Sequence, residues 1–225
     1  MASFRVPAEQ ASSVAKLISL PHDVLEELSS ALQNASTSMS LEETIREIVL
    51  TIDSLQEDDK AYIASVIYSL YMVRASSELT LDEFAEDILE SIGESAHEEL
   101  LKVPEETVEN VAPYVRNLFS SDPLFISAKA VLILYENNFI FSGARVLTDV
   151  RHVFGEDLSE SPKAAVLVHT LRVQNLRGKP NDSVYIALET NELQKIIDVL
   201  ERAKQKAEIL QATLEGSGVS LLERE

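Results

Sequence analysis

The residues best suited to chemistry in this sequence are its histidines, because an imidazole can bind a metal ion or transfer a proton near neutral pH. None has helical ligand spacing to another, and the HExxH motif is absent. His152 and His169 lie in strand-like segments, so a two-ligand metal site across neighbouring strands is conceivable, but no third ligand is indicated. We therefore predict hydrogen-bonded structural histidines and keep the metal site as an alternative. The four histidines are His22, His97, His152 and His169.

Paired carboxylates are the other candidates for acid–base chemistry. Glu98 and Glu99, and likewise Glu105 and Glu106, are adjacent in predicted helices, where neighbouring residues do not face one another. We expect these pairs to be solvated. The chain also lacks a P-loop, a GxGxxG motif and a nucleophile elbow. The sequence thus predicts a protein that is not an enzyme and has no cofactor, although a hydrolase with an unrecognised site is kept as an alternative.

The acidic stretch that ends at Glu83 and Phe84 is similar to the end of a calcium-binding EF-hand loop. With Glu83 as the closing ligand, Arg74 would occupy the third ligand position and Ser77 that of the required glycine. The spacing of Thr80 and Glu83 is instead typical of a capping box. An ordinary capped helix is therefore predicted here.

Charge is distributed unevenly along the 225 residues, whose formal net charge is −19. Residues 1–144 carry 25 acidic and 8 basic side chains, whereas residues 145–225 carry 13 and 11. The acidic part repels nucleic acid and anionic lipid, and no cluster of basic and aromatic residues offsets it. We expect no nucleic-acid partner and no membrane association, and the absence of cysteine favours the cytoplasm.

The first domain, residues 1–142, is predicted to be all helical, because Ala, Leu, Glu, Ile and Val are abundant and the whole chain has only 6 glycines and 7 prolines. Ser40 and Glu43 have the spacing of a capping box, and Pro104 and Pro113 are expected to bracket a short segment. Amphipathic helical patterns recur over residues 9–33, 41–55, 57–73 and 81–92, and a helix is expected over 122–135.

The second domain, residues 143–225, is predicted to be a β-β-β-α module, which makes the fold class α+β. Alternating patterns over residues 145–154, 164–175 and 183–189 predict three strands, with a helix kept as the alternative for the first segment. The turn formers at 177–182 separate the last two strands. Leu171 and Val173 share a face of the second strand. Three strands and one helix expose much apolar surface when alone.

A long helix is predicted from Thr190 to Leu214. Thr190 or Asn191 is expected to cap its start, and Gly216 follows its end. Apolar residues spaced alternately by three and four positions form a seam typical of a helix that packs along a partner. The seam consists of Leu193, Ile196, Leu200, Ala203, Ala207, Leu210 and Leu214.

The order of these elements resembles the COMM-domain proteins. The segments that carry the resemblance are RVLTDVRHVF, AVLVHTLRVQN and SVYIALETNELQKIIDVLERA, the last being a strand that passes directly into a long helix. The resemblance implies a helical N-terminal domain followed by a strand-and-helix module. It also implies dimers formed through that module, and a role in assembly rather than catalysis.

The predicted function is therefore a scaffold or adaptor that pairs with itself or a related chain and contacts other proteins. Pairing is preferred over a helix that covers its own sheet, because the seam extends beyond the length of three strands of about seven residues. The alternative is a regulatory protein that senses a small molecule or a metal through a pocket between the domains.

Overall fold

The computed structural model describes residues 6–176, 183–219 and 221–222, and it has the predicted α+β fold. The turn predicted at 177–182 lies outside the described residues. Two compact units are present, one within residues 1–134 and the other over residues 135–221. The elements of the first unit are α1 (Ala8–Ile18), α2 (His22–Gln33), α3 (Leu41–Leu50), α4 (Glu57–Ser76), α5 (Leu81–Gly93), α6 (Glu98–Leu101), α7 (Glu105–Leu118) and α8 (Asp122–Tyr135).

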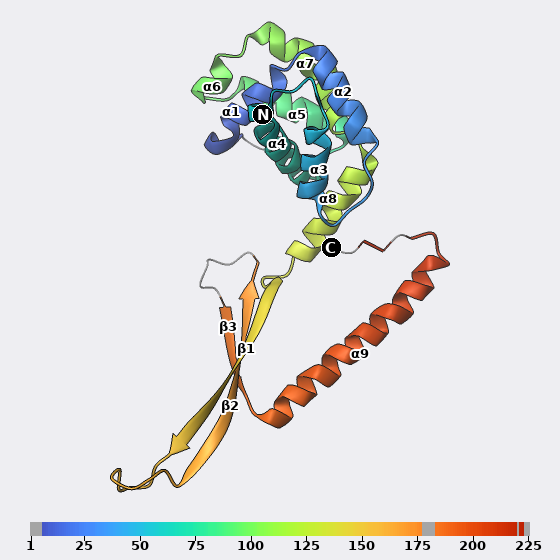
Figure 1. Cartoon of the computed structure of the whole chain (residues 1–225). Coiled ribbons are helices and arrows are strands. Elements are labelled where there is room, and N and C mark those ends of the chain that lie inside the picture. The colour runs from blue at the N-terminus through green and yellow to red at the C-terminus, as the bar shows by residue number, and fades with distance from the viewer. Residues whose placement is uncertain (1–5, 177–182, 220, 223–225) are drawn as a thin grey trace. The chain divides into compact units, whose positions relative to one another are not determined.

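Helix α4 lies at the centre of the helical unit and packs against α1 and α3 (Figure 1). The buried face predicted for this helix is confirmed for five of its six residues, and the sixth, Val73, is only half-buried; the five are Ile63, Val66, Ile67, Leu70 and Tyr71. Tyr71 on this face meets the ring of Phe119 at a centroid distance of 5.3 Å, and Phe84 of α5 approaches Phe119 edge-on at 5.6 Å. This aromatic cluster joins α4 and α5 to the end of α7.

Two buried polar groups of α4 hold the connection between α7 and α8. The Tyr71 hydroxyl donates to the carbonyl of Leu118 at 2.8 Å, and the Arg74 guanidinium donates to the carbonyl of Phe119. Arg74 also lies 4.0 Å from the ring centroid of Phe125. Burial raises the pKa of the Tyr71 hydroxyl and lowers that of Arg74. The polar groups thus bind the carbonyls that the end of α7 leaves without helical partners.

The capping box predicted at the start of α5 is confirmed. The backbone N–H of Thr80 donates to Glu83 Oε2 at 2.8 Å, and the N–H of Glu83 donates to Thr80 Oγ1 at 3.4 Å. The Thr80 backbone N–H, helped by its hydroxyl, lowers the pKa of the Glu83 carboxyl. Glu83 is thus part of a helix cap, in agreement with the prediction of an ordinary capped helix.

The capping box predicted for α3 is wrong, although the helix begins at the predicted place. The backbone N–H of Ser40 donates to Ser38 Oγ at 2.9 Å, so it is not available to a side chain three residues later. Glu43 instead pairs with Arg46 at 2.6 Å.

The segment boundary predicted at Pro113 is also wrong, because Pro113 lies inside α7. Proline removes one helical N–H, but Val111 and Val115 on either side of it are buried. Since α7 packs against α2 and α5, we infer that tertiary burial offsets the missing hydrogen bond.

The second unit contains the predicted strands and the long helix (Figure 1). The strands form an antiparallel sheet in the order β1-β2-β3. Strand β1 has 13 residues and β2 has 12, nearly twice the length of about seven residues assumed when the helix was compared with the sheet, and β2 spans the predicted segment 164–175. The preference for pairing assumes strands too short for the helix to lie along. That assumption is wrong for β1 and β2. The elements are β1 (Phe141–Val153), β2 (Ala164–Asn175), β3 (Ser183–Leu188) and α9 (Thr190–Glu215).

Candidate protein interaction surface

Strand register gathers aliphatic side chains on one face of the sheet. Val146 pairs with Leu171, and Leu171 pairs in turn with Ile186. Since alternate residues of a strand share a face, these pairs define which side chains lie together. The apolar sheet face consists of Val146, Val150, Leu167, Leu171, Val173, Val184 and Ile186, with Thr148 and His169 among them.

The apolar sheet face is open to solvent within one chain. Five of its aliphatic members, two each from β1 and β3 and one from β2, are between 41% and 57% exposed. Leu171 and Val173, which were predicted as interaction residues, are half-buried beside them. Such a contiguous exposed apolar area is typical of a surface that another protein covers.

The opposite face is mixed in character. It carries Arg145, Asp149, Arg151 and Arg172 between its apolar residues. Arg172 donates through Nε to Ser183 Oγ at 3.1 Å and lies 5.9 Å from the ring centroid of Tyr185. This face therefore presents charge and hydrogen-bonding groups to solvent, and we take the apolar sheet face as the candidate for association.

Strand β3 is much shorter than its neighbours, so part of the sheet is a two-stranded ribbon. Pairing between β2 and β3 begins at His169 and Leu188, whereas β1 and β2 continue to the pair Val153 and Ala164. A two-stranded hairpin is marginally stable alone, and unpaired strand edges are sites where another chain can add. Because β3 is short, one edge of β2 is left unpaired along the ribbon and is available to another chain.

Helix α9 carries the predicted seam but buries none of its residues. Leu193 and Ile196 near its start are half-buried, and Leu214 at its end is as well. The four seam positions between them are exposed, with Leu200 at 59% and Leu210 at 62%. The helix touches β2 near its start, yet it does not cover the apolar sheet face of its own chain.

The cap predicted for α9 is wrong by one residue. Glu189 is the N-cap, and its backbone N–H donates to Glu192 Oε2 at 2.8 Å. Thr190, one of the two predicted caps, lies in the first turn and directs its hydroxyl at His169. A long-range partner for the threonine therefore takes the place of a local capping bond.

His169 connects both neighbouring elements to β2. Its Nδ1 lies 2.8 Å from Thr148 Oγ1 on β1, and its Nε2 lies 3.1 Å from Thr190 Oγ1 on α9. The side chain is 9% exposed. The predicted structural role is confirmed for this histidine, which joins the start of the long helix to the centre of the sheet.

The two-ligand metal site is wrong, because the register separates its histidines. His169 pairs with Thr148, whereas His152 pairs with Ala165, so the two positions on β1 are four residues apart. At about 3.3 Å per residue this corresponds to roughly 13 Å, too far for one ion. Among the described residues, no group of three or more metal-ligating side chains is arranged to hold a metal. The predicted pair of histidine ligands is therefore not formed.

The sequence indicated interaction residues on β2 and α9. It did not show which aliphatic residues of β1 and β3 lie beside them. Their alternation was visible, with Val184 and Ile186 on one face of the third strand. The missing information was the register, which brings Val146 and Ile186 to either side of Leu171. Alternation alone does not tell which faces of separate strands become one surface.

Within the part of the chain that the structure describes, no single helix is long and apolar enough to cross a membrane. Only α7 and α8 taken together meet that test, and they are bent by 73° relative to each other.

No protein-family model matches the chain, and a search of curated proteins also found no match.

Proposed function

We propose that this protein is a non-enzymatic scaffold that dimerises through β1, β2, β3 and α9. The observation that carries the proposal is that one module leaves two apolar surfaces uncovered, the apolar sheet face and the seam of α9. In a symmetric dimer each chain would offer both surfaces to its partner, so a single association would cover all four.

Burial of many half-exposed aliphatic groups supplies the driving force in this proposal. A fully buried leucine or valine contributes about 1.5–3 kcal/mol relative to an exposed one, so a half-exposed side chain has roughly 1 kcal/mol left to gain. No single contact is then decisive. The set acts together, and the unpaired edges of the sheet add backbone hydrogen bonds.

The resemblance to COMM-domain proteins supports the same proposal. The chain has a helical unit followed by three strands and a long helix, the order that the resemblance implies. The partner we propose for this module is a second copy or a related chain. In the dimer, the helical unit would contact other proteins. The cysteine-free composition favours the cytoplasm as the compartment.

Light scattering of the full-length protein over a concentration series tests the proposal. The chain mass is 24.9 kDa, so a dimer should reach about twice this value. Ile186→Glu places a charge on the apolar sheet face and should yield the monomer. Tyr185→Glu is the matched control, because Tyr185 lies on the opposite face beside Arg172 and is 62% exposed.

A wild-type mass that stays at the monomer value at every concentration would contradict self-association. An equal effect of the two substitutions would contradict the choice of face.

A further inference from the structure

A cavity of about 470 Å³ lies in the helical unit, where the end of α5, the short helix α6 and the start of α7 meet. Ligand pockets typically measure about 300–1,000 Å³, so this volume suffices for a large side chain and its neighbours. The lining residues are Ile92, Gly93, Leu100, Leu101, Val103, Glu105, Val108 and Glu109.

The interior of the cavity is aliphatic. Ile92 and Leu100 are almost fully buried, and Val103 and Val108 are half-buried. Leu101, also a lining residue, is 67% exposed although it is a large apolar side chain. The cavity therefore continues into an apolar rim, as a site for an anchoring side chain requires.

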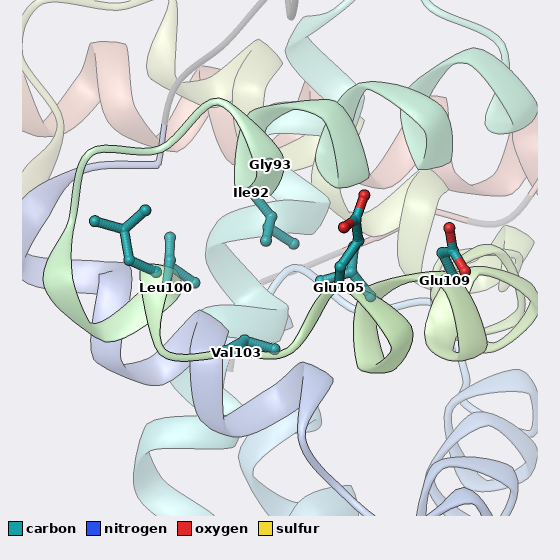
Figure 2. A pocket seen from close by; sticks show the side chains of 8 residues that line it. Ile92, Gly93, Leu100, Val103, Glu105 and Glu109 are labelled. Atoms are coloured by element: carbon teal, nitrogen blue, oxygen red, sulfur yellow. The ribbon is translucent and has the colours of Figure 1, made fainter.

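The charge at the cavity is entirely negative. Glu105 and Glu109 are exposed and lie one helical turn apart on α7, and Figure 2 shows both carboxylates pointing the same way. None of the eight lining residues is basic. The nearby Lys102 pairs with Glu98 at 2.7 Å. The two carboxylates are thus positioned to meet a cation that a ligand brings.

We propose that this cavity binds a basic amphipathic segment of a partner protein. An aliphatic or aromatic anchor would enter between Ile92 and Leu100, and lysine or arginine side chains one turn away would pair with Glu105 and Glu109. The net charge of −17 over residues 1–144 attracts such a segment and repels phosphate-bearing ligands. This site is independent of the proposed dimer interface and adds a second class of partner.

The test is an NMR titration of full-length protein with a blocked 15-residue helical peptide that carries one leucine anchor and lysines three residues before and four residues after it. Methyl signals of Ile92, Leu100 and Val108 should shift in a saturable manner. Peptides with the anchor changed to alanine, or with the lysines changed to glutamate, should not saturate these signals.

Charge removal at the rim should weaken binding of the leucine–lysine peptide. In Glu105→Gln/Glu109→Gln the dissociation constant should rise about 3- to 20-fold, the range expected for two exposed ion pairs. The matched control is Glu43→Gln/Glu47→Gln, which removes two charges with the same spacing from α3. The control should bind as the wild type does.

Gly93 permits a second test, which blocks the cavity without removing charge. A Cβ at this lining position would have no atom within 4 Å, and the backbone there requires no glycine. Gly93→Leu should therefore fold and lose the peptide, whereas Gly93→Ala should retain most of the affinity.

Equal weakening by the α3 and α7 charge variants would overturn the proposal, since it would indicate general attraction to an acidic surface. Failure of the peptide to bind, or undiminished binding to Gly93→Leu, would overturn it as well. Leu200→Glu, on the seam of α9, changes no residue of this cavity and should bind the peptide normally. A failure of dimerisation is thereby distinguishable from a failure of this site.

Discussion

Substitution of Leu200 by glutamate tests the helical half of the proposed dimer interface. Leu200 lies at the middle of the α9 seam and is 59% exposed in the single chain. Leucine and glutamate have similar helix propensities, and an exposed substitution usually changes the free energy of unfolding by less than about 0.5 kcal/mol. The new carboxylate would also lie one turn before Lys204. The substituted chain should therefore fold normally.

The effect on dimerisation should be far larger. An unpaired carboxylate buried in an apolar seam costs about 3 kcal/mol or more, and each chain of a symmetric dimer contributes one. Two such costs correspond to a rise of about 10⁴-fold in the dimer dissociation constant. A dimer of nanomolar affinity would become a weak dimer of roughly 10 μM.

Val199→Glu is the matched control. Val199 precedes Leu200, is not one of the seam residues and is 64% exposed, so it presents the same new charge about 100° away around α9. Sedimentation equilibrium should give a near wild-type dissociation constant for this variant, and circular dichroism should give the same helix content for both. The reasoning is refuted if Leu200→Glu dimerises like the wild type, or if Val199→Glu is equally disruptive.

Three further predictions concern the helical unit. Phe119→Ala should lower the free energy of unfolding in urea by about 3–5 kcal/mol, because Phe119 is buried against two other aromatic rings; a loss below 1 kcal/mol would contradict this packing. The pKa of Tyr71 is raised in the folded protein. Its contribution to the free energy of unfolding is therefore fully present below the pKa of an unfolded tyrosine, about 10, and is lost as pH rises further. Tyr71→Phe should therefore flatten the alkaline part of a stability–pH profile, and an unchanged slope would count against it. The pKa of Glu83 is lowered, so its stabilising effect is present above the pKa of an unfolded glutamate, about 4.3, and is lost as pH falls through the folded value. Glu83→Gln should thus weaken the dependence of thermal stability on pH below about 4.3, whereas identical acid profiles would refute the role of the cap.

Much of the fold was predictable because its signals are local. The buried face of α4 follows from residues three and four positions apart, and the strands follow from alternation. Thr80 and Glu83 could be assigned to a capping box because both partners lie within one turn. Ser40 and Glu43 have the same spacing but different neighbours, and Ser38 and Arg46 bind them instead. Spacing alone could not resolve that competition.

The candidate interaction surface was only half predictable. The seam of α9 is a property of one continuous segment, so its residues could be identified together. The apolar sheet face depends on which residues of separate strands are paired, and a shift of one position would turn β1 over. The same register places Thr148, rather than His152, opposite His169.

The sequence by itself determined the α+β class, the order of the elements and the apolar stripe of the last helix, because period, capping and turn chemistry act over a few residues. Only the tertiary structure decided that His169 joins Thr148 to Thr190, and that α5, α6 and α7 together line a cavity with Glu105 and Glu109 at its rim. It also decided that α9 leaves the apolar sheet face uncovered. These features arise from contacts between residues far apart in the chain, whose pairing is selected by the packing of the whole unit.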